Sequence, residues 1–256
     1  ETYGGASCNV YRSFDGGTTW TVLTNGLPTA SANSGRIGLA ISESSPDVVY
    51  AIYADKVGYF KGIYKTTNSG NSWVKVNDGA LSNMFASYGW WFGRIHVDPT
   101  NPDVVYAIGF DLYKSTNGGS SWTNIGSAVH VDHHAVYVHP KNPNFVVLGN
   151  DGGVYLSKNA ASSWTHVNNL PITQFYTCEM DAKNPKRLYG GAQDNGVNRT
   201  ITGNMNDWKS IVGGDGFVAL VDPTNNNYVY GESQYGALQR STDGGVSFSS
   251  ATSGIS

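Results

Sequence analysis

One eight-residue pattern recurs five times along this chain and constrains its fold more than any other feature. The pattern has Ser or Thr first, Asp or Asn two positions later, Gly or Ala two after that, another Ser or Thr, and a closing aromatic residue. The five copies are Ser13–Trp20, Thr66–Trp73, Ser115–Trp122, Ser157–Trp164 and Ser241–Phe248. Repetition at intervals of roughly 40–50 residues indicates an architecture built of repeated units.

Each position of the pattern has a local physical role, so we call each copy a clamp turn. The third residue is predicted to accept hydrogen bonds from backbone amides of its own turn, and Gly permits positive φ. These third residues are Asp15, Asn68, Asn117, Asn159 and Asp243. The closing aromatic residue is predicted to be largely buried beside its turn. These anchors are Trp20, Trp73, Trp122, Trp164 and Phe248.

Between the clamp turns, four short apolar strands, a to d, recur in the same order. A polar Pro/Asn turn separates a from b, and a Tyr on strand c precedes most clamp turns, as at Tyr64 and Tyr113. Such strands predict an all-β fold, a β-propeller of four-stranded antiparallel blades. Residues 1–256 are expected to form a single propeller domain. Its repeats end near Trp20, Trp73, Trp122, Trp164, Trp208 and Phe248.

The blade count is five complete blades plus half a blade. Residues 8–23 supply only strands c and d of the first one. Five and a half blades do not close a ring, and an open sheet edge invites pairing. We therefore expect a fragment of a longer chain whose ring has six to eight blades, or neighbouring subunits that complete the propeller.

The clamp turn frame, Ser-x-Asp-x-Gly-x-Ser/Thr-Trp, resembles the Asp-box, or bacterial neuraminidase repeat. This repeat occurs in sialidases, sortilin-like receptors, family 74 xyloglucan hydrolases and many secreted bacterial β-propellers. The resemblance covers the whole chain and implies a propeller fold. Because the motif is structural in all these groups, it implies no particular activity. Together with a charge-poor surface, it implies secretion or a place on a bacterial cell surface.

Composition excludes two classes of partner. Charged residues make up 14% of the chain, the net charge is −3 and Lys or Arg never cluster, so nucleic-acid binding is not expected. No apolar run approaches the ~18 residues of a membrane-spanning helix.

Two cysteines, Cys8 and Cys178, exclude a disulfide framework. Cys178 aligns with Ile95 and Val136, so it is expected to be a core residue.

Strand alternation sorts the loops by face. Clamp turns and Pro/Asn turns share one end of the blades, and the b-to-c and d-to-a loops share the other, which we call the irregular face. Variable loops on a regular scaffold usually carry function. Three carboxylates are expected there, and they are the candidate catalytic residues of a glycoside hydrolase. They are Asp151, Asp194 and Asp215, which can equally be turn formers.

Family resemblance disfavours catalysis. Family 74 enzymes carry a catalytic Asp immediately before an Ile-Gly-Gly-x-Tyr segment. The similar segment here is Asp151–Tyr155, and Asn150 stands where that Asp would fall, as Gln193 does in the next blade. An amide cannot protonate a leaving group. Sialidase chemistry needs three arginines, and only Arg36 and Arg94 lie near the starts of inner strands.

The segment His130-Val131-Asp132-His133-His134 is the densest group of possible metal ligands. Imidazole and carboxylate suit Zn²⁺. Neighbours on a strand point to opposite faces, so His133 and His134 should not reach one ion. Polar packing inside the propeller or contact with a ligand are the other interpretations. We expect neither a metal nor a cofactor.

The longest loop, Asp78–Phe92, ends in adjacent aromatic residues that can stack on sugar rings or seat a protein partner. They can equally plug the axial channel of the propeller or seal against a missing blade. We predict an extracellular, non-catalytic binding or scaffold propeller that engages a glycan or protein through its irregular face. The predicted ligand-binding residues are Tyr88, Trp90, Trp91, Phe92, His133, His134, Asp151 and Asp194. The alternatives are a hydrolase acting on β-glucan or xyloglucan-like polysaccharide, and a structural subunit of an extracellular assembly.

Overall fold

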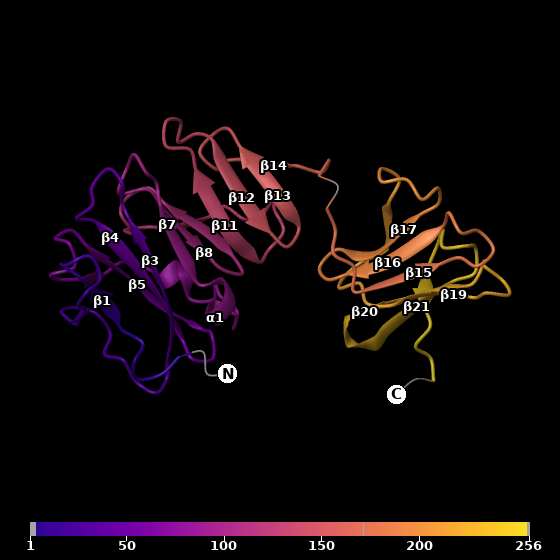
Figure 1. Cartoon of the computed structure of the whole chain (residues 1–256), viewed down its shortest axis with the longest axis horizontal. Coiled ribbons are helices and arrows are strands. Elements are labelled where there is room, and N and C mark those ends of the chain that lie inside the picture. Colours follow the sequence, from indigo (N-terminus) through magenta and orange to yellow (C-terminus); the bar gives the residue numbers. More distant parts are fainter. Residues whose placement is uncertain (1–3, 171, 255–256) are drawn as a thin grey trace. The chain divides into compact units, whose positions relative to one another are not determined.

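The computed structural model describes residues 4–170 and 172–254. It divides the chain into two compact units, Glu1–Asn168 and Asn169–Ser256, which are described separately (Figure 1). The boundary falls in a connection between two sheets. The expectation of a single domain stays a prediction, and residues 1–3, 171 and 255–256 of that domain lie outside the described residues.

The first unit contains one two-stranded sheet and three four-stranded sheets (Figure 1). The half-blade is β1 (Val10–Arg12) and β2 (Thr21–Leu23). Blade 1 is β3 (Ser34–Ile41), β4 (Val49–Asp55), β5 (Phe60–Thr66) and β6 (Val74–Lys75). Blade 2 is β7 (Arg94–Val97), β8 (Val105–Ile108), β9 (Leu112–Ser115) and β10 (Thr123–Asn124). Blade 3 is β11 (His133–Val138), β12 (Val146–Asn150), β13 (Gly153–Ser157) and β14 (Thr165–His166). Two short helices, η1 (Gly79–Leu81) and α1 (Gly89–Phe92), lie between blades 1 and 2 in the sequence.

The second unit contains two four-stranded sheets. Blade 4 is β15 (Thr177–Met180), β16 (Leu188–Ala192), β17 (Gly196–Thr200) and β18 (Lys209–Val212). Blade 5 is β19 (Ala219–Val221), β20 (Val229–Ser233), β21 (Ala237–Ser241) and β22 (Ser249–Ser250), with η2 (Gln234–Gly236) inside it. Every described sheet pairs strands antiparallel in chain order. The predicted all-β propeller fold, with five complete blades and half a blade, is therefore confirmed.

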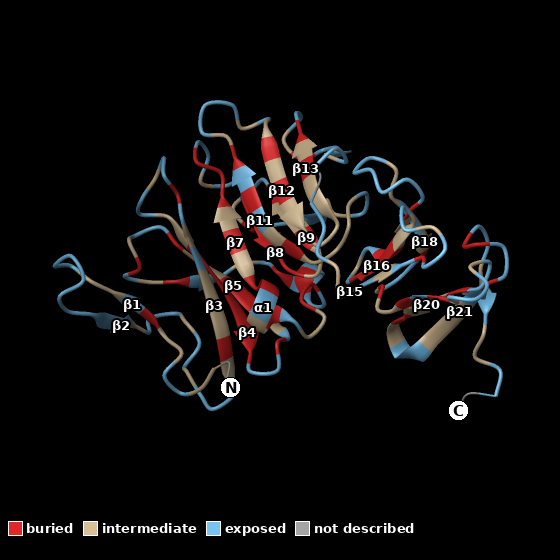
Figure 2. Ribbon diagram, turned by 45° about the vertical axis from the view of Figure 1, so that its right-hand side comes forward, coloured by how far each residue is buried: buried red, intermediate tan, exposed pale blue. Residues whose placement is uncertain are grey.

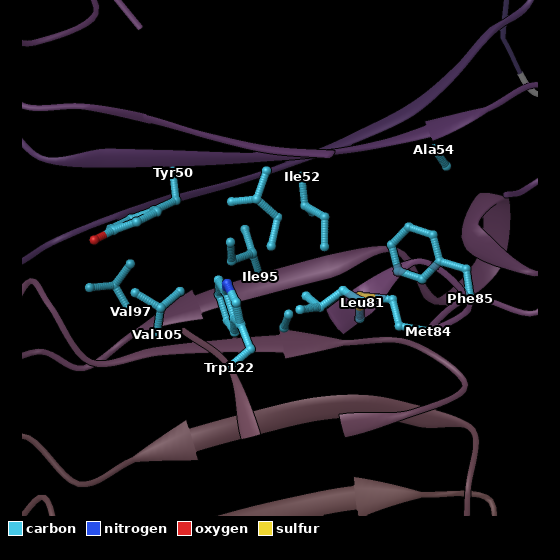
Figure 3. Packing of buried hydrophobic residues seen from close by; sticks show 12 residues of the cluster. Tyr50, Ile52, Ala54, Leu81, Met84, Phe85, Ile95, Val97, Val105 and Trp122 are labelled. Atoms are coloured by element: carbon cyan, nitrogen blue, oxygen red, sulfur yellow. The ribbon is translucent and has the colours of Figure 1, made fainter. Parts of the chain in front are cut away.

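The apolar core lies between successive blades. Tyr50 and Ile52 of β4 face Ile95 and Val97 of β7, and Trp122 lies beside them (Figure 3). Buried residues accordingly run along β4 and β8, the second strands of their blades (Figure 2). A blade is thus stabilised by the apolar face of its neighbour as well as by its own strand pairing.

The clamp turns form the hydrogen bonds that their sequence predicts. In blade 2, Ser115 Oγ donates to Asn117 Oδ1 at 3.0 Å and accepts the Gly119 N–H at 2.9 Å. Asn117 Oδ1 also accepts the Ser121 N–H at 2.9 Å. The other four third-position side chains accept the corresponding backbone N–H. Each turn is closed within eight residues, which is why a short pattern suffices to specify it.

The turn of blade 4 lacks the repeated pattern and is closed by different residues. Thr200 ends strand c as Ser115 does, and its hydroxyl donates to Asp207 Oδ1 and accepts the Gly203 N–H. Asp207 Oδ2 accepts the Thr202 N–H at 3.1 Å. The carboxylate that closes this turn therefore comes from the far end of the loop.

The predicted burial of the anchors is only partly correct. Trp73 and Trp122 are buried, Trp164 and Phe248 are partly buried, and Trp20 is exposed. The buried anchors pack against the preceding sheet, as Trp73 does against Val10 and Leu23 of the half-blade. Among the described residues no sheet precedes the half-blade, so Trp20 has no such surface. Its indole N–H donates to Gly17 within its own turn.

The expectation that Cys178 is a core residue is also wrong. Cys178 lies on β15, the first strand of the second unit, and is exposed. The aligned Ile95 and Val136 are buried because a preceding blade of the same unit covers them. Within the second unit no described blade precedes β15. Across residues 4–170 and 172–254, none of the helices has the length and apolar character needed to cross a membrane.

Candidate functional site

The aromatic residues at 88–92 form a helical turn rather than a loop tip. Tyr88 precedes α1, and its ring lies 6.3 Å from that of Phe92. Trp91 is 54% exposed and Tyr88 is about half exposed, whereas Phe92 is buried. The predicted role of Phe92 as a ligand contact is therefore corrected, because its ring supports the turn from the interior. Trp90 is partly buried, and its ring lies 6.0 Å from Trp91.

The helical turn is fixed to the sheet beneath it through backbone contacts. The Arg36 guanidinium, on β3, donates to the carbonyl oxygens of Trp90 at 3.3 Å and Trp91 at 2.8 Å. The Gly89 N–H donates to the Gly58 carbonyl at 2.8 Å. A Cβ at Gly89 would lie 2.5 Å from the Phe85 ring, so glycine is required for this close approach. The exposed Trp91 side chain therefore projects from a rigid support.

A polar pair adjoins the aromatic turn. His134, on β11, donates from Nε2 to Asp151 Oδ1 at 2.6 Å, and Asp151 lies in the turn between β12 and β13. The His134 ring lies 5.0 Å from Phe92 and 6.2 Å, edge-on, from Trp91. We call Tyr88, Trp91, His134 and Asp151 the aromatic–acidic site. It combines half-exposed rings with a carboxylate and an imidazole, both about one-third exposed or less.

Asn150 has a structural role in this site. Its Nδ2 donates to the His130 carbonyl at 2.7 Å, and its Oδ1 accepts the Gly152 N–H at 3.1 Å. The amide thus holds the turn that carries Asp151. This use agrees with the sequence argument that the residue preceding Asp151 is not an acid.

The structure places His133 in the interior, which corrects its predicted role as a ligand contact. Its side chain is buried, and Nδ1 makes no hydrogen bond within residues 4–170 and 172–254. Burial, with smaller contributions from His130 and His134, lowers the pKa of His133 to about 4. The imidazole is therefore neutral at pH 7, as polar packing requires.

In the second unit, Asp215 closes a turn. Its Oδ1 accepts the Asp194 N–H at 3.0 Å, and its own N–H donates to Gln234 Oε1 at 2.9 Å. Asp194 has φ of 61°, the left-handed conformation that Asp tolerates better than most residues. These contacts connect three loops, and they fit the turn-forming interpretation of Asp194 and Asp215. Asp151 belongs to the first unit, whereas Asp194 and Asp215 belong to the second.

Sequence reasoning missed several exposed or partly exposed aromatic residues of the second unit. The Tyr176 ring stacks on Phe217 with centroids 5.8 Å apart, and its hydroxyl donates to Gln193 Oε1. Tyr235 is fully exposed at φ of 65°. Its segment Ser233–Gly236 occupies the same b-to-c position as Asn150–Gly153. That positional equivalence was the signal available in the sequence.

No protein-family model matches this chain, and no curated protein matches it either. Solved structures do resemble it. A family 74 glycoside hydrolase of Niastella koreensis is 20% identical over 97% of this chain, with a TM-score of 0.49. YCF48 bound to D1 peptide is 16% identical over 98%, covers 77% of that chain and has a TM-score of 0.44. A chain of the nidogen/laminin complex is 10% identical over 87%, covers 80% of that chain and has a TM-score of 0.41.

With TM-scores below 0.5 and identities of 20% or less, these neighbours decide neither the fold nor the function of this chain. This chain spans 42% of the Niastella enzyme and 33% of an ancestral family 74 enzyme. Identities at this level do not carry an activity from those proteins to this one.

Proposed function

We propose that this protein is a non-catalytic binding propeller that engages a polysaccharide through the aromatic–acidic site. The observation that carries the proposal is the half-exposed Trp91 ring beside the His134–Asp151 pair. Extracellular location, on a bacterial surface or in the medium, belongs to the same proposal. It is supported by the charge-poor composition and the resemblance to the Asp-box.

Sugar rings present an apolar face and a rim of hydroxyls, and the site offers a counterpart to each. Trp91 and Tyr88 supply apolar ring faces at the surface. Asp151 supplies carboxylate oxygens that accept hydroxyl protons, and His134 restricts its orientation. Little conformational entropy should be lost when a ligand binds this surface, because Arg36 already holds the carbonyl groups of the helical turn.

The hydrolase alternative receives less support. An inverting enzyme needs a carboxylic acid and a carboxylate that share one substrate and remain free for proton transfer. Asp215 is engaged by a backbone N–H, and Asp151 is engaged by an imidazole. Asn150 holds a turn where a family 74 acid would stand.

The test is binding of soluble xyloglucan and mixed-linkage β-glucan, measured by affinity electrophoresis and titration calorimetry. Trp91→Ala should weaken binding by about 1–3 kcal/mol if the ring is an anchor. Trp20→Ala is the matched control, because Trp20 is also more than half exposed but lies in the half-blade. Asp151→Asn should change affinity modestly.

Reducing-sugar release measured on the same samples separates binding from hydrolysis. We expect no turnover from the parent protein. Turnover that Asp151→Asn or Asp194→Asn abolishes, with the fold intact, would establish the hydrolase instead. Binding that is equal in Trp91→Ala and Trp20→Ala would remove the aromatic–acidic site from the proposal, and absence of polysaccharide binding would favour a protein ligand.

A further inference from the structure

A cation stands directly before the first residue of most clamp turns, as an additional member of the repeated pattern. Five of the 16 Lys and Arg residues of the chain stand at this one position, which indicates a shared role. They are Arg12, Lys65, Lys114, Arg199 and Arg240, whereas blade 3 has Leu156 there.

These cations point toward the following blade. Neighbouring residues of a strand point to opposite faces of their sheet. Tyr64 and Tyr113, the residues before Lys65 and Lys114 on strand c, pack in the interface with the preceding blade. The cation beside each tyrosine therefore lies on the face that meets the next blade.

Three of the cations bond to the same atom of the next blade, the carbonyl oxygen of the fourth residue of its clamp turn. The half-blade makes this contact with blade 1, blade 2 makes it with blade 3, and blade 4 makes it with blade 5. The contacts are Arg12 to Ser69, Lys114 to Ala160 at 2.7 Å, and Arg199 to Gly244 at 2.6 Å.

Lys65 reaches the equivalent place between blades 1 and 2 but bonds to a carboxylate there. Its Nζ donates to Asp103 Oδ1 at 2.9 Å. The Asp103 carbonyl accepts the N–H of Gly118, the fourth residue of that clamp turn, at 2.9 Å. A Cβ at Gly118 would lie 2.6 Å from Lys65 Nζ, so the cation contacts the same residue of the turn.

The backbone of the fourth residue is shaped to join two blades. Ser69 and Ala160 have φ of 58° and 55°, a left-handed conformation that is uncommon for residues with a Cβ. The Ala160 N–H donates to the Asn144 carbonyl of its own blade at 2.9 Å, and its carbonyl accepts the Lys114 ammonium of the preceding blade. The strained residue therefore bonds to its own blade through one backbone group and to the preceding blade through the other.

Lys114 is partly withdrawn from water at this contact. Its Nζ lies 5.5 Å from the centre of the Tyr106 ring, as Lys65 Nζ lies 5.3 Å from that of Tyr50. Burial lowers the pKa of Lys114. A partly desolvated ammonium needs acceptors in the protein, and the Ala160 carbonyl and the Tyr106 ring face supply them.

We propose that the cation of strand c and the fourth residue of the next clamp turn form an inter-blade latch. The latch makes the closure of one blade's clamp turn depend on a charge of the preceding blade. Blade 3, with Leu156, has no cation for this role. The latches lie at the clamp-turn end of the blades, so this device is separate from the aromatic–acidic site.

The test is hydrogen–deuterium exchange of the full chain, read at the amides of residues 157–164. In this turn Ala160, Ala161 and Ser163 donate backbone hydrogen bonds. Lys114→Met keeps most of the aliphatic stem and removes the charge. It should speed exchange in that turn roughly tenfold or more, because a hydrogen bond to a charged group is lost and local opening becomes easier. Exchange in blade 2's own clamp turn, residues 115–122, should stay unchanged.

Two variants separate the latch from other effects. Lys114→Arg should keep slow exchange, because Arg12 and Arg199 make the same contact in other blades. Lys158→Met is the matched control, since Lys158 is an exposed lysine inside the clamp turn of blade 3, and it should not speed exchange. In the second unit, Arg199→Met should speed exchange of residues 241–248.

Unchanged exchange of residues 157–164 in Lys114→Met would overturn the proposal. Equal acceleration of both clamp turns would do the same, because it would indicate general destabilisation of the unit. Acceleration by Lys114→Arg that matches Lys114→Met would show that the charge is not what closes the turn.

Discussion

Trp20 and Trp73 close successive clamp turns at the same position, yet Trp20 is 62% exposed and Trp73 is 5% exposed. Trp73 packs against Val10 and Leu23 of the preceding sheet, while Trp20 contacts its own turn. The same residue in the same local structure therefore has two environments, and the neighbouring sheet makes the difference.

This relationship predicts unequal effects of truncation. Trp73→Ala should lower the free energy of unfolding by about 3–5 kcal/mol, because it empties a buried site. Trp20→Ala should change it by less than about 0.5 kcal/mol, as exposed substitutions usually do. Urea unfolding monitored by circular dichroism measures both. A large loss for Trp20→Ala would show that the half-blade is covered in solution.

The clamp turn of blade 2 should tolerate loss of its central side chain at moderate cost. Asn117→Ala removes the acceptor for the Ser115 hydroxyl and the Ser121 N–H. We expect a loss of about 1 kcal/mol, typical of local side-chain capping. Thr116→Ala, at the exposed neighbouring position, is the control. A loss above about 3 kcal/mol would mean that the residue does more than hold its turn.

Asp207 should make the stability of the second unit sensitive to acid. Hydrogen bonds, first from the Thr200 hydroxyl, lower the pKa of Asp207 below its ordinary value. The unfolded state therefore binds the proton more readily than the folded state. The stabilisation that the Asp207 carboxylate contributes is complete above about pH 4 and is lost as pH falls through the lower folded pKa. Asp207→Ala should therefore lower the Tm at pH 7 and flatten its decline between pH 4 and 2. Asn206→Ala, in the same turn, should leave both unchanged.

Protonation of His133 should make the free energy of unfolding depend on pH in a less acidic range than protonation of Asp207 does. Its folded pKa of about 4 lies below the ordinary value of about 6.5, so the unfolded state binds more protons between these values. Stability is complete above about pH 6.5 and is lost as pH falls to about 4, by on the order of 3 kcal/mol. His133→Leu should remove this slope, whereas His166→Leu, at an exposed site, should retain it. Denaturant midpoints are measured at half-unit pH steps for the parent protein and both variants. A slope that is unchanged in His133→Leu would contradict the assignment to His133.

Local features were predictable because their interactions close within a few residues. The clamp turn is an example, since Ser115, Asn117 and Ser121 bond to one another inside one repeat. Four-stranded blades follow from the same regularity, because each short strand pairs with the next one along the chain. The hydrogen bond between Thr200 and Asp207 that closes the turn of blade 4 was not predicted, because the spacing of these two residues differs from that of the repeated pattern.

Burial and the composition of the candidate site were decided by tertiary structure. Trp20, Leu39 and Cys178 have counterparts that are buried, but each is exposed because burial of that position depends on a neighbouring sheet. His134 and Asp151 meet because β11 pairs with β12 and the register shifts at His134, next to the turn that carries Asp151. The sequence alone determined the repeated blade, whose contacts are local. The folded structure decided which apolar and polar side chains face solvent, because that depends on packing between blades.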